Sequence, residues 1–341
     1  MRIANYYSNS DIRLEETPRP QIGRKEILMQ VEASGICGSD VIEWYRKNVP
    51  LVLGHETAGV VVEVGSGTRN FKVGDRIVAT HHVPCLKCEY CRNGHETVCE
   101  TLRTTRFDPG GFAEFVRVPA MNVDLGTLKI PSHVSFEEAT FVEPLGCVVR
   151  AQRLAGMKKG KRLVVIGSGM AGLLHIQLAH QRGAKTIIAT DIDPYRLRLA
   201  KRFGATVAVN AIENVPQKVK QANQGRLGDI VILCSSSPEA ICQGLQSVER
   251  GGVVLVFTAA KKDAFMPVSL NDLFWRTELT ILSSYAASPA DLQEALQWIA
   301  KKKINVKDMI THRLPLAEIQ RGFDLTLRPR RSVKVIIQPQ K

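Results

Sequence analysis

The segment VVIGSGMAGLLHIQLA, residues 164–179, constrains the fold of this chain more than any other stretch. A short apolar run ends at Gly167, the pattern continues with Gly169 and Gly172, and an apolar helical pattern follows. A G-x-G-x-x-G motif alone is a weak signal, but between a strand and a helix it marks a dinucleotide-binding turn. Gly167 would allow the tight turn, Gly169 would let the backbone approach a pyrophosphate, and Gly172 would allow close helix packing.

Residues around this motif predict the kind of dinucleotide. Met170 and Ala171 would form the first helical turn, whose free N–H groups face the phosphates. Asp191 stands nineteen residues beyond Gly172, at the end of the second predicted strand. A carboxylate there accepts hydrogen bonds from the ribose hydroxyls and repels a 2′-phosphate, which favours NAD over NADP. Arg196 lies five residues later and could accommodate a phosphate. The alternative is a glycine-rich turn followed by an Asp helix cap.

Hydrophobic patterns divide the chain into three stretches. Residues 1–144 are rich in β-strand patterns, with β-branched runs separated by glycines. Residues 145–284 alternate short buried strands with helices, which is typical of a parallel sheet covered by helices. Residues 285–341 contain one helix pattern and one strand pattern, too little to fold alone, so we expect them to return to the first stretch.

Composition narrows the class of protein. The chain has 341 residues, 44% hydrophobic and 23% charged, and shows neither an apolar leader nor a run of membrane-spanning length. We therefore expect a cytoplasmic protein that makes no membrane contact. The net charge of +13 is spread over short clusters, aromatic residues are only 6%, and no nucleic-acid-binding module accompanies them. A nucleic-acid partner is not expected.

Four of the eight cysteines form a C-x2-C-x2-C-x7-C run within residues 83–100: Cys85, Cys88, Cys91 and Cys99. In a cytoplasmic chain, clustered thiols bind metal more often than they form disulfides. Three further segments, GICGSD, LGHETAG and FVEPLGC, contain Cys37, His55 with Glu56, and Glu143. Taken singly, each of these residues has an ordinary core or surface explanation. The remaining cysteines, Cys147, Cys234 and Cys242, are expected to be buried structural thiols.

Together with the nicotinamide site, these segments resemble the zinc-dependent medium-chain dehydrogenase/reductase family, in particular its sorbitol dehydrogenase-like members. The stretch GHETAGVVVEVGSGTRNFKVGDRIV is especially similar to the family's zinc-site signature. The resemblance covers nearly the whole chain. It implies an α/β fold in which a GroES-like β-rich catalytic domain is split around a Rossmann-type doubly wound parallel sheet that binds NAD.

The resemblance also implies two zinc sites. Cys37 and His55 would be ligands of a catalytic zinc, with a carboxylate from either Glu56 or Glu143 as third ligand. The other carboxylate would lie behind the ligands or exchange with the open position. The four clustered cysteines would hold a second, structural zinc with no open position.

Two residues of the GICGSD segment have implied roles in catalysis. Asp40 corresponds to the acid that orients the histidine ligand. Ser39 occupies the position of the hydroxyl that relays the substrate's proton. The catalytic group therefore comprises Ser39, Asp40, Glu56 and Glu143.

The implied activity is reversible, NAD-linked oxidation of a secondary alcohol to a ketone by hydride transfer, with a polyol or cyclitol as the favoured small-molecule substrate. L-Threonine 3-dehydrogenase and a simple secondary-alcohol dehydrogenase are the alternatives. A zinc-free quinone or enoyl reductase and a non-catalytic dinucleotide-binding protein fit less well, because the ligand residues and the cysteine lobe are present. Trp44, Tyr45 and Arg106 are candidate substrate contacts or ordinary surface residues. The family suggests a homodimer or homotetramer.

Overall fold

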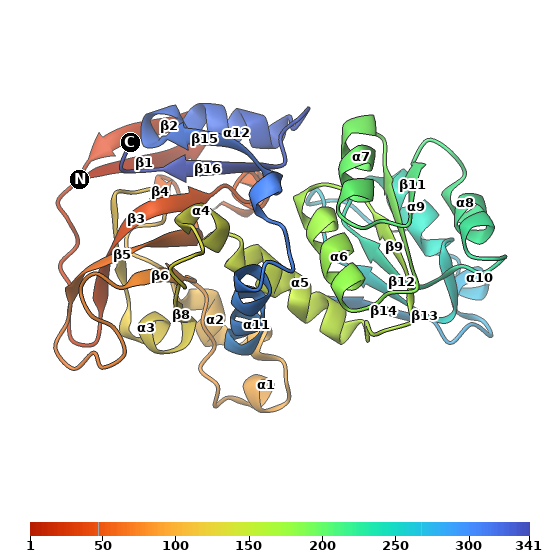
Figure 1. Cartoon of the computed structure of the whole chain (residues 1–341), viewed down its shortest axis with the longest axis horizontal. Coiled ribbons are helices and arrows are strands. Elements are labelled where there is room, and N and C mark those ends of the chain that lie inside the picture. The colour runs from red at the N-terminus through yellow and green to blue at the C-terminus, as the bar shows by residue number, and fades with distance from the viewer. Residues whose placement is uncertain (47, 267) are drawn as a thin grey trace. The chain divides into compact units, whose positions relative to one another are not determined.

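The computed structural model describes residues 1–46, 48–266 and 268–341. The chain forms two compact units: Met1–Gly146 together with Ala286–Lys341, and Cys147–Tyr285. Each unit has its own β-structure (Figure 1). The sequence predicts boundaries after residues 144 and 284, within two residues of these divisions. In the described part of the chain, no helix has both the length and the apolar character needed to cross a membrane.

The first unit is built on a seven-stranded sheet with the order β15-β16-β3-β5-β6-β8, in which β7 also pairs with β3. The strands are β3 (Ile27–Gly35), β5 (Glu56–Val64), β6 (Arg76–Ala79), β7 (Phe115–Val118), β8 (Thr127–Lys129), β15 (Ile310–Pro315) and β16 (Lys334–Gln338). Strands β3 and β5 pair antiparallel along most of their length. Gly59 permits this pairing, because a Cβ at that position would collide with the carbonyl oxygen of Gln30.

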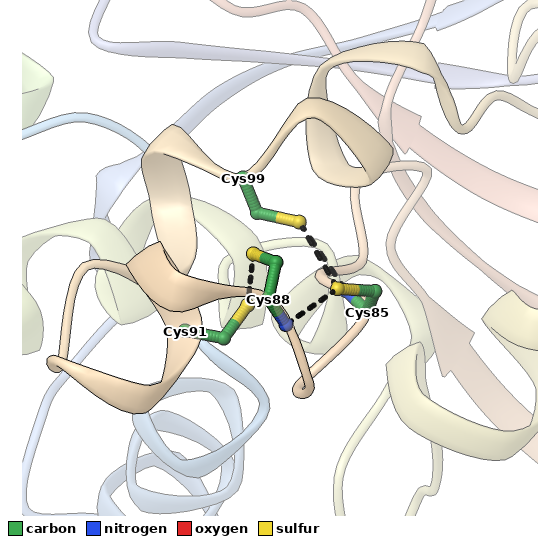
Figure 2. Close-up of side chains that lie close together, drawn as sticks. All are labelled: Cys85, Cys88, Cys91 and Cys99. Carbon is green, nitrogen blue, oxygen red and sulfur yellow. Dashed lines mark hydrogen bonds between the residues drawn. The ribbon is translucent and has the colours of Figure 1, made fainter.

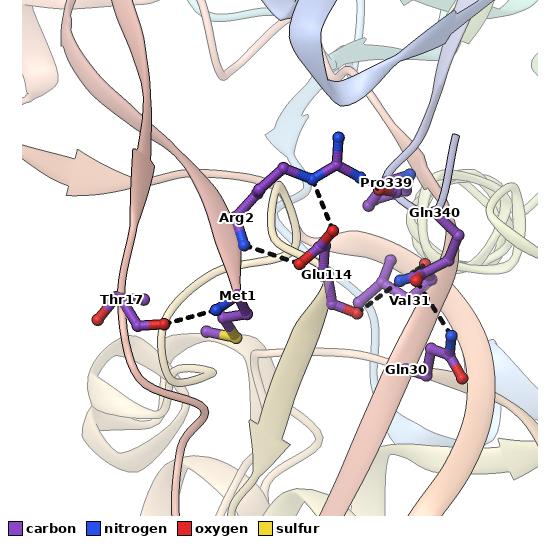
Figure 3. A network of polar contacts seen from close by, with 8 residues as sticks. All are labelled: Met1, Arg2, Thr17, Gln30, Val31, Glu114, Pro339 and Gln340. Atoms are coloured by element: carbon purple, nitrogen blue, oxygen red, sulfur yellow. Dashed lines mark hydrogen bonds and ion pairs between the residues drawn. The ribbon is translucent and has the colours of Figure 1, made fainter.

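A smaller sheet of three strands, β1 (Arg2–Ser8), β2 (Asp11–Glu16) and β4 (Leu51–Val52), lies beside it in the order β2-β1-β4. Glu114 connects the chain's first and last segments (Figure 3). Its carboxylate accepts the backbone N–H of Arg2 at 2.7 Å and the Nε of the same residue at 2.6 Å, and its carbonyl accepts the Gln340 side-chain amide at 2.8 Å. The C-terminal segment is therefore an integral part of the first unit.

Most helices of the first unit are short, and two of them begin with a side-chain cap. They are α1 (Glu89–Arg92), α2 (Glu100–Thr104), α3 (Ala120–Gly126), α4 (Phe136–Ala139), α11 (Pro289–Ala300) and α12 (Ile319–Leu327), with 3₁₀ turns η1 (Glu43–Tyr45), η2 (Glu96–Val98), η3 (Lys307–Met309) and η4 (Leu316–Glu318). Capping boxes begin α4 at Ser135 and α11 at Ser288. Helix α5 (Val142–Leu154) begins in the first unit and continues into the second.

The second unit is a six-stranded, wholly parallel sheet with the order β11-β10-β9-β12-β13-β14. Its strands are β9 (Arg162–Ile166), β10 (Thr186–Asp191), β11 (Val207–Asn210), β12 (Gly228–Leu233), β13 (Val248–Val256) and β14 (Thr280–Ser283). Numbered from β9, this is the order 3-2-1-4-5-6 of a doubly wound sheet, and it confirms the predicted α/β fold.

Helices connect these parallel strands: α6 (Met170–Gln181), α7 (Pro194–Arg202), α8 (Val215–Ala222), α9 (Pro238–Leu245) and α10 (Leu270–Phe274). Asp193 caps α7 by accepting the N–H of Tyr195 at 2.8 Å, with Pro194 at the first helical position. Local sequence signals therefore determine where this helix begins.

Candidate metal and cofactor sites

The register of the central sheet brings three candidate ligands together. Gly35, at the end of β3, lies opposite Glu56, at the start of β5. Because the two strands are antiparallel, Cys37, just beyond β3, and His55, just before β5, meet at the same end of the sheet. One potential ligand atom from each of Cys37, His55 and Glu56 lies within 4.8 Å of the other two. A thiolate, an imidazole and a carboxylate are the donors expected of a catalytic zinc site.

Asp40 orients two of these ligands from behind. Its Oδ2 accepts the backbone N–H of Cys37 at 2.9 Å, and its Oδ1 lies 3.4 Å from Nδ1 of His55. Burial alone would lower the pKa of His55, but the adjacent Asp40 carboxylate raises it well above its usual value. Burial would likewise raise the pKa of Asp40, but the histidine and the Cys37 N–H hold it below its usual value. With Nδ1 turned towards Asp40, the other ring nitrogen of His55 is the one available to a metal.

Glu56 is fully buried and has one oxygen in use. Its Oε2 pairs with the ammonium group of Lys334, whereas Oε1 has no hydrogen-bond partner among the described side chains. A buried carboxylate oxygen without a partner is costly, and a bound cation would satisfy it. The residues present therefore fit a metal ion.

The other residues implied for this site lie in different surroundings. Glu143, in the first turn of α5, is not part of the three-residue group and instead lines a small pocket with Thr80 and Leu128. Its role as a third ligand remains a prediction. Ser39 is half-buried, and its backbone N–H lies 3.4 Å from the Cys37 sulfur. Its hydroxyl role is likewise still a prediction.

His81 and His82 belong to the same neighbourhood and were not recognised from the sequence. The ring centroid of His81 lies 5.0 Å from that of His55 and 3.6 Å from that of His82. Burial, with added repulsion from neighbouring cationic groups such as Arg106, lowers the pKa of His82 to about 4 and that of His81 well below its usual value. Both rings are therefore neutral at pH 7. The HHVPC segment offered a signal, but only the β5–β6 register shows that these histidines approach His55.

The three candidate substrate contacts are exposed residues. Trp44 and Tyr45 pack against each other edge to face in η1, with Arg46 over the Tyr45 ring. Arg106 is exposed, and its charge contributes to the lowered pKa of both His81 and His82.

The cysteine lobe forms a second metal-binding group (Figure 2). Ligand atoms of Cys85, Cys88, Cys91 and Cys99 all lie within 4.8 Å of one another, with sulfur–sulfur distances of 3.5 Å for Cys88–Cys91 and 3.6 Å for Cys99–Cys85. Burial would raise the pKa of Cys99, but neighbouring backbone N–H groups lower it to about 6, which favours the thiolate. Four convergent sulfurs fit a closed tetrathiolate zinc site.

None of the three cysteines outside both groups is fully buried, although the sequence predicted buried thiols at all three. Cys147 and Cys234 are partly exposed. Cys242 is exposed on α9, so the prediction of a buried thiol is wrong at this position because Cys242 occupies the solvent side of its helix.

The glycine turn between β9 and α6 has the geometry that a pyrophosphate requires. Gly167 adopts φ +95°, and a Cβ on Gly172 would collide with the Gly167 carbonyl. At Gly169 an added Cβ would meet only Nη1 of Arg196, 3.8 Å away, so the space above this residue is open. No side chain caps the start of α6 at Met170 and Ala171, which leaves their N–H groups for an anionic ligand.

Asp191 ends β10 next to this turn. Its Oδ2 accepts the Ser168 N–H at 2.9 Å and its Oδ1 accepts the Asp193 N–H at 2.9 Å. Arg196, in α7, lies 3.8 Å from Oδ2. The carboxylate is therefore held at the strand end, beside both the glycine turn and a guanidinium group.

Comparisons with known proteins agree with this geometry. Residues 23–132 match the alcohol dehydrogenase GroES-like domain, and residues 171–301 match the zinc-binding dehydrogenase family. The chain belongs to the zinc-dependent medium-chain dehydrogenase/reductase family. The predicted family and the GroES-like and Rossmann-type architecture are confirmed.

Several relatives of this dehydrogenase have named activities. The chain is 32% identical to a protein described as a D-xylulose reductase A from Aspergillus clavatus, over 92% of this chain and 89% of the relative. It is 33% identical to an L-threonine 3-dehydrogenase from Caldanaerobacter subterraneus subsp. tengcongensis, over 99% and 98%. It is 30% identical to sorbitol dehydrogenase from Gallus gallus, over 96% and 93%.

Solved structures resemble the dehydrogenase over its whole length. Galactitol-1-phosphate dehydrogenase from Escherichia coli matches with a TM-score of 0.89 and 26% identity, covering 99% of this chain and 100% of that one. A protein described as a zinc-binding dehydrogenase from Sinorhizobium meliloti 1021, solved with NADP, matches with a TM-score of 0.89 and 30% identity, covering 99% of each chain.

Proposed function

We propose that this dehydrogenase oxidises a secondary alcohol group of a small polyol or cyclitol to a ketone, reversibly, using one catalytic zinc, one structural zinc and NAD. The observation that carries the proposal is the group of Cys37, His55 and Glu56, in which one Glu56 oxygen has no hydrogen-bond partner among the described residues. When bound, zinc acidifies an alcohol and polarises a carbonyl, and NAD accepts the hydride. The protein's own part is to hold these reactants and to move one proton.

Residues of the GICGSD segment are proposed to orient the metal ligands and to move the proton. Asp40 holds the Cys37 backbone by a hydrogen bond and places its other carboxylate oxygen 3.4 Å from Nδ1 of His55, and it would thereby orient both ligands before a metal binds. Ser39, two residues from Cys37, would accept the alcohol proton at its Oγ and pass it towards solvent. We propose that Glu56 is the third ligand. Glu143 would lie behind the ligands or exchange with the open position.

A polyol is the favoured substrate. The neutral rings of His81 and His82 lie close to His55, and neutral imidazoles can both donate and accept hydrogen bonds with hydroxyl groups. One relative is a sorbitol dehydrogenase, and sorbitol is a polyol. L-Threonine is the second candidate, because Arg106 supplies a positive charge near the same histidines and a carboxylate would suit it.

A substrate panel tests this proposal. Sorbitol, xylitol, myo-inositol, 2,3-butanediol and L-threonine would be compared by NADH absorbance. We expect the highest kcat/KM for a polyol or an inositol. Arg106→Gln should leave that value unchanged but should lower kcat/KM for L-threonine if threonine is a substrate. No oxidation of any of these alcohols would refute the proposal.

Metal analysis distinguishes a zinc-dependent dehydrogenase from a zinc-free reductase and from a protein that only binds a dinucleotide. The proposal requires about two zinc ions per chain, held by the catalytic group and by the cysteine lobe. A zinc-free quinone or enoyl reductase, or a protein that only binds a dinucleotide, would retain at most the zinc of the lobe.

NAD is the proposed cofactor because of Asp191. A 2′-phosphate near its carboxylate would be repelled, so we expect NAD to be preferred by about one hundred-fold in kcat/KM. Arg196 opposes this preference, and one similar structure was solved with NADP. Asp191→Gly should shrink the preference mainly by weakening NAD binding. Equal use of NAD and NADP by the unmodified protein would show that Asp191 does not contact the adenosine ribose.

A homodimer formed through the second unit is the proposed assembly, with a homotetramer as the larger alternative. Strand β14 lies at the edge of the sheet, and among the described residues 265–285 the side chains of Phe265, Leu270 and Trp275 are 82%, 70% and 71% exposed. A second copy could pair with this edge and cover these side chains. Light scattering should show a dimer that Trp275→Glu weakens; a monomeric wild-type protein would exclude it. We also propose that the protein is located in the cytoplasm.

A further inference from the structure

Lys334 is a buried lysine beside the proposed catalytic metal site. It is the first residue of β16, and its side chain is 1% exposed. The ammonium group donates to Oε2 of Glu56 and, at 3.1 Å, to the carbonyl oxygen of Ile36, and it lies 5.7 Å from the centre of the Phe141 ring. A lysine is almost never fully buried unless its charge is paired. Glu56 supplies that pairing.

Strand register explains why this lysine lies here. Ile336 of β16 lies opposite Gly35 of β3, and the backbone N–H of Ile36 donates to the Val335 carbonyl at 3.0 Å, so Lys334 comes next to this end of β3. Gly35 leaves room for the ion pair, because a Cβ at this position would collide with both Glu56 Oε2 and the Lys334 side chain. The pair is therefore built into the sheet and is not a chance surface contact.

The two oxygens of Glu56 differ in their surroundings. Oε2 is neutralised by Lys334, whereas Oε1 is buried and has no hydrogen-bond partner in the part of the chain that the structure describes. Glu56 is also the residue that groups with Cys37 and His55. A single carboxylate charge thus lies between a resident ammonium group and the place where a divalent cation would bind. Two cations that share one anion in a buried site repel each other.

We infer that Lys334 is a positioning residue that competes with the catalytic zinc for the Glu56 carboxylate and thereby limits how tightly that zinc is held. By retaining Oε2, the lysine would weaken the hold of Glu56 on the metal, while the fourth position of a four-coordinate zinc stays open to the substrate. This inference rests on the proposed use of Cys37, His55 and Glu56 as a metal site. It does not depend on which alcohol is oxidised.

The rate of zinc release to a chromogenic chelator tests the competition directly. The wild-type protein should release two zinc ions in separate phases, and the phase that Cys37→Ser abolishes is that of the catalytic site. In Lys334→Met the ammonium charge is lost and the aliphatic chain is kept, so release in that phase should slow about tenfold or more. Lys334→Arg retains the charge and should release zinc at a rate close to that of the wild type. Release from the cysteine lobe should not change in either variant.

A second comparison remains informative if Lys334→Met fails to fold because of its unpaired carboxylate. In Glu56→Gln the ammonium group faces the metal site without a counter-charge, so zinc should leave faster than from the wild type. The double variant Glu56→Gln/Lys334→Met removes both buried charges and should hold zinc more tightly than Glu56→Gln alone.

The outcomes separate this inference from the proposed function. Unchanged or faster zinc release from Lys334→Met would refute the proposed competition. Equal zinc release from Glu56→Gln and from Glu56→Gln/Lys334→Met would refute it as well. If Lys334 had a purely structural role, Lys334→Met would lower the thermal stability equally with and without zinc. The rate of zinc release would then stay unaltered. A wild-type protein without any zinc phase sensitive to Cys37→Ser would instead refute the catalytic metal site itself.

Discussion

Lowering the pH from 7 to 5 should weaken the second unit through one residue, His175 in α6. Its imidazole is completely buried, its Nδ1 lies 3.4 Å from the Gln152 amide, and the ring packs edge to face on Phe257 with centroids 4.6 Å apart. Its Nε2 has no hydrogen-bond partner among the described residues. Burial, with a smaller repulsion from Arg182, lowers the pKa of His175 to about 3.

The sign of the effect follows from proton uptake. In the unfolded chain a histidine has a pKa near 6.5, so between pH 6.5 and pH 3 the unfolded state binds a proton that the folded state does not. The contribution of His175 to stability is therefore present above pH 6.5 and is lost as the pH falls towards 3. Each pH unit corresponds to about 1.4 kcal/mol, so about 2 kcal/mol should be lost between pH 7 and pH 5.

Hydrogen exchange of the buried amides of β9 and β10, followed by mass spectrometry, reads the stability of this unit separately from the metal sites. His175→Gln keeps a polar side chain beside Gln152, and His175→Phe keeps a ring against Phe257. Both variants should be less stable than the wild type at pH 7. Relative to the wild type, each should regain about 2 kcal/mol between pH 7 and pH 5, because neither carries the titrating imidazole. A difference between variant and wild type that stays constant over this pH range would refute the reasoning.

Three further predictions concern the proposed sites. Cys88→Ser should lose one zinc per chain by metal analysis and unfold at a lower temperature, with only an indirect effect on catalysis; full zinc content with no turnover would reverse the structural assignment. Ser39→Ala should retain zinc and NAD binding but slow alcohol oxidation by roughly one hundred-fold, and a pH–rate profile identical to that of the wild type would exclude its role as proton relay. Gly172→Ala should force the Gly167 turn apart, destabilise the protein by about 2 kcal/mol and weaken NAD binding measured by fluorescence titration. Normal NAD affinity in that variant would show that the turn tolerates a Cβ.

Local sequence was sufficient to predict the second unit and the cysteine lobe. The strand, the glycine motif, the helix and Asp191 follow one another within about thirty residues, and each element depends on its immediate neighbours. Likewise, the four lobe cysteines are so close in sequence that a few turns bring their sulfurs together. In both regions the physical determinants are short-range, so composition and spacing carry the information.

Long-range strand pairing brings the members of the candidate metal site together. Sequence alone left Glu56 and Glu143 as equal choices, and the β3–β5 register brings Cys37 to the same end of the sheet as His55 and its neighbour Glu56. The two adjacent histidines of the HHVPC segment were a weak signal, and only the pairing of β6 with β5 shows that His81 approaches His55. Lys334 is 278 residues from Glu56, and the contact exists because β16 lies next to β3. Which strands become neighbours depends on how the whole sheet buries its apolar faces, and no local pattern in the sequence encodes that choice.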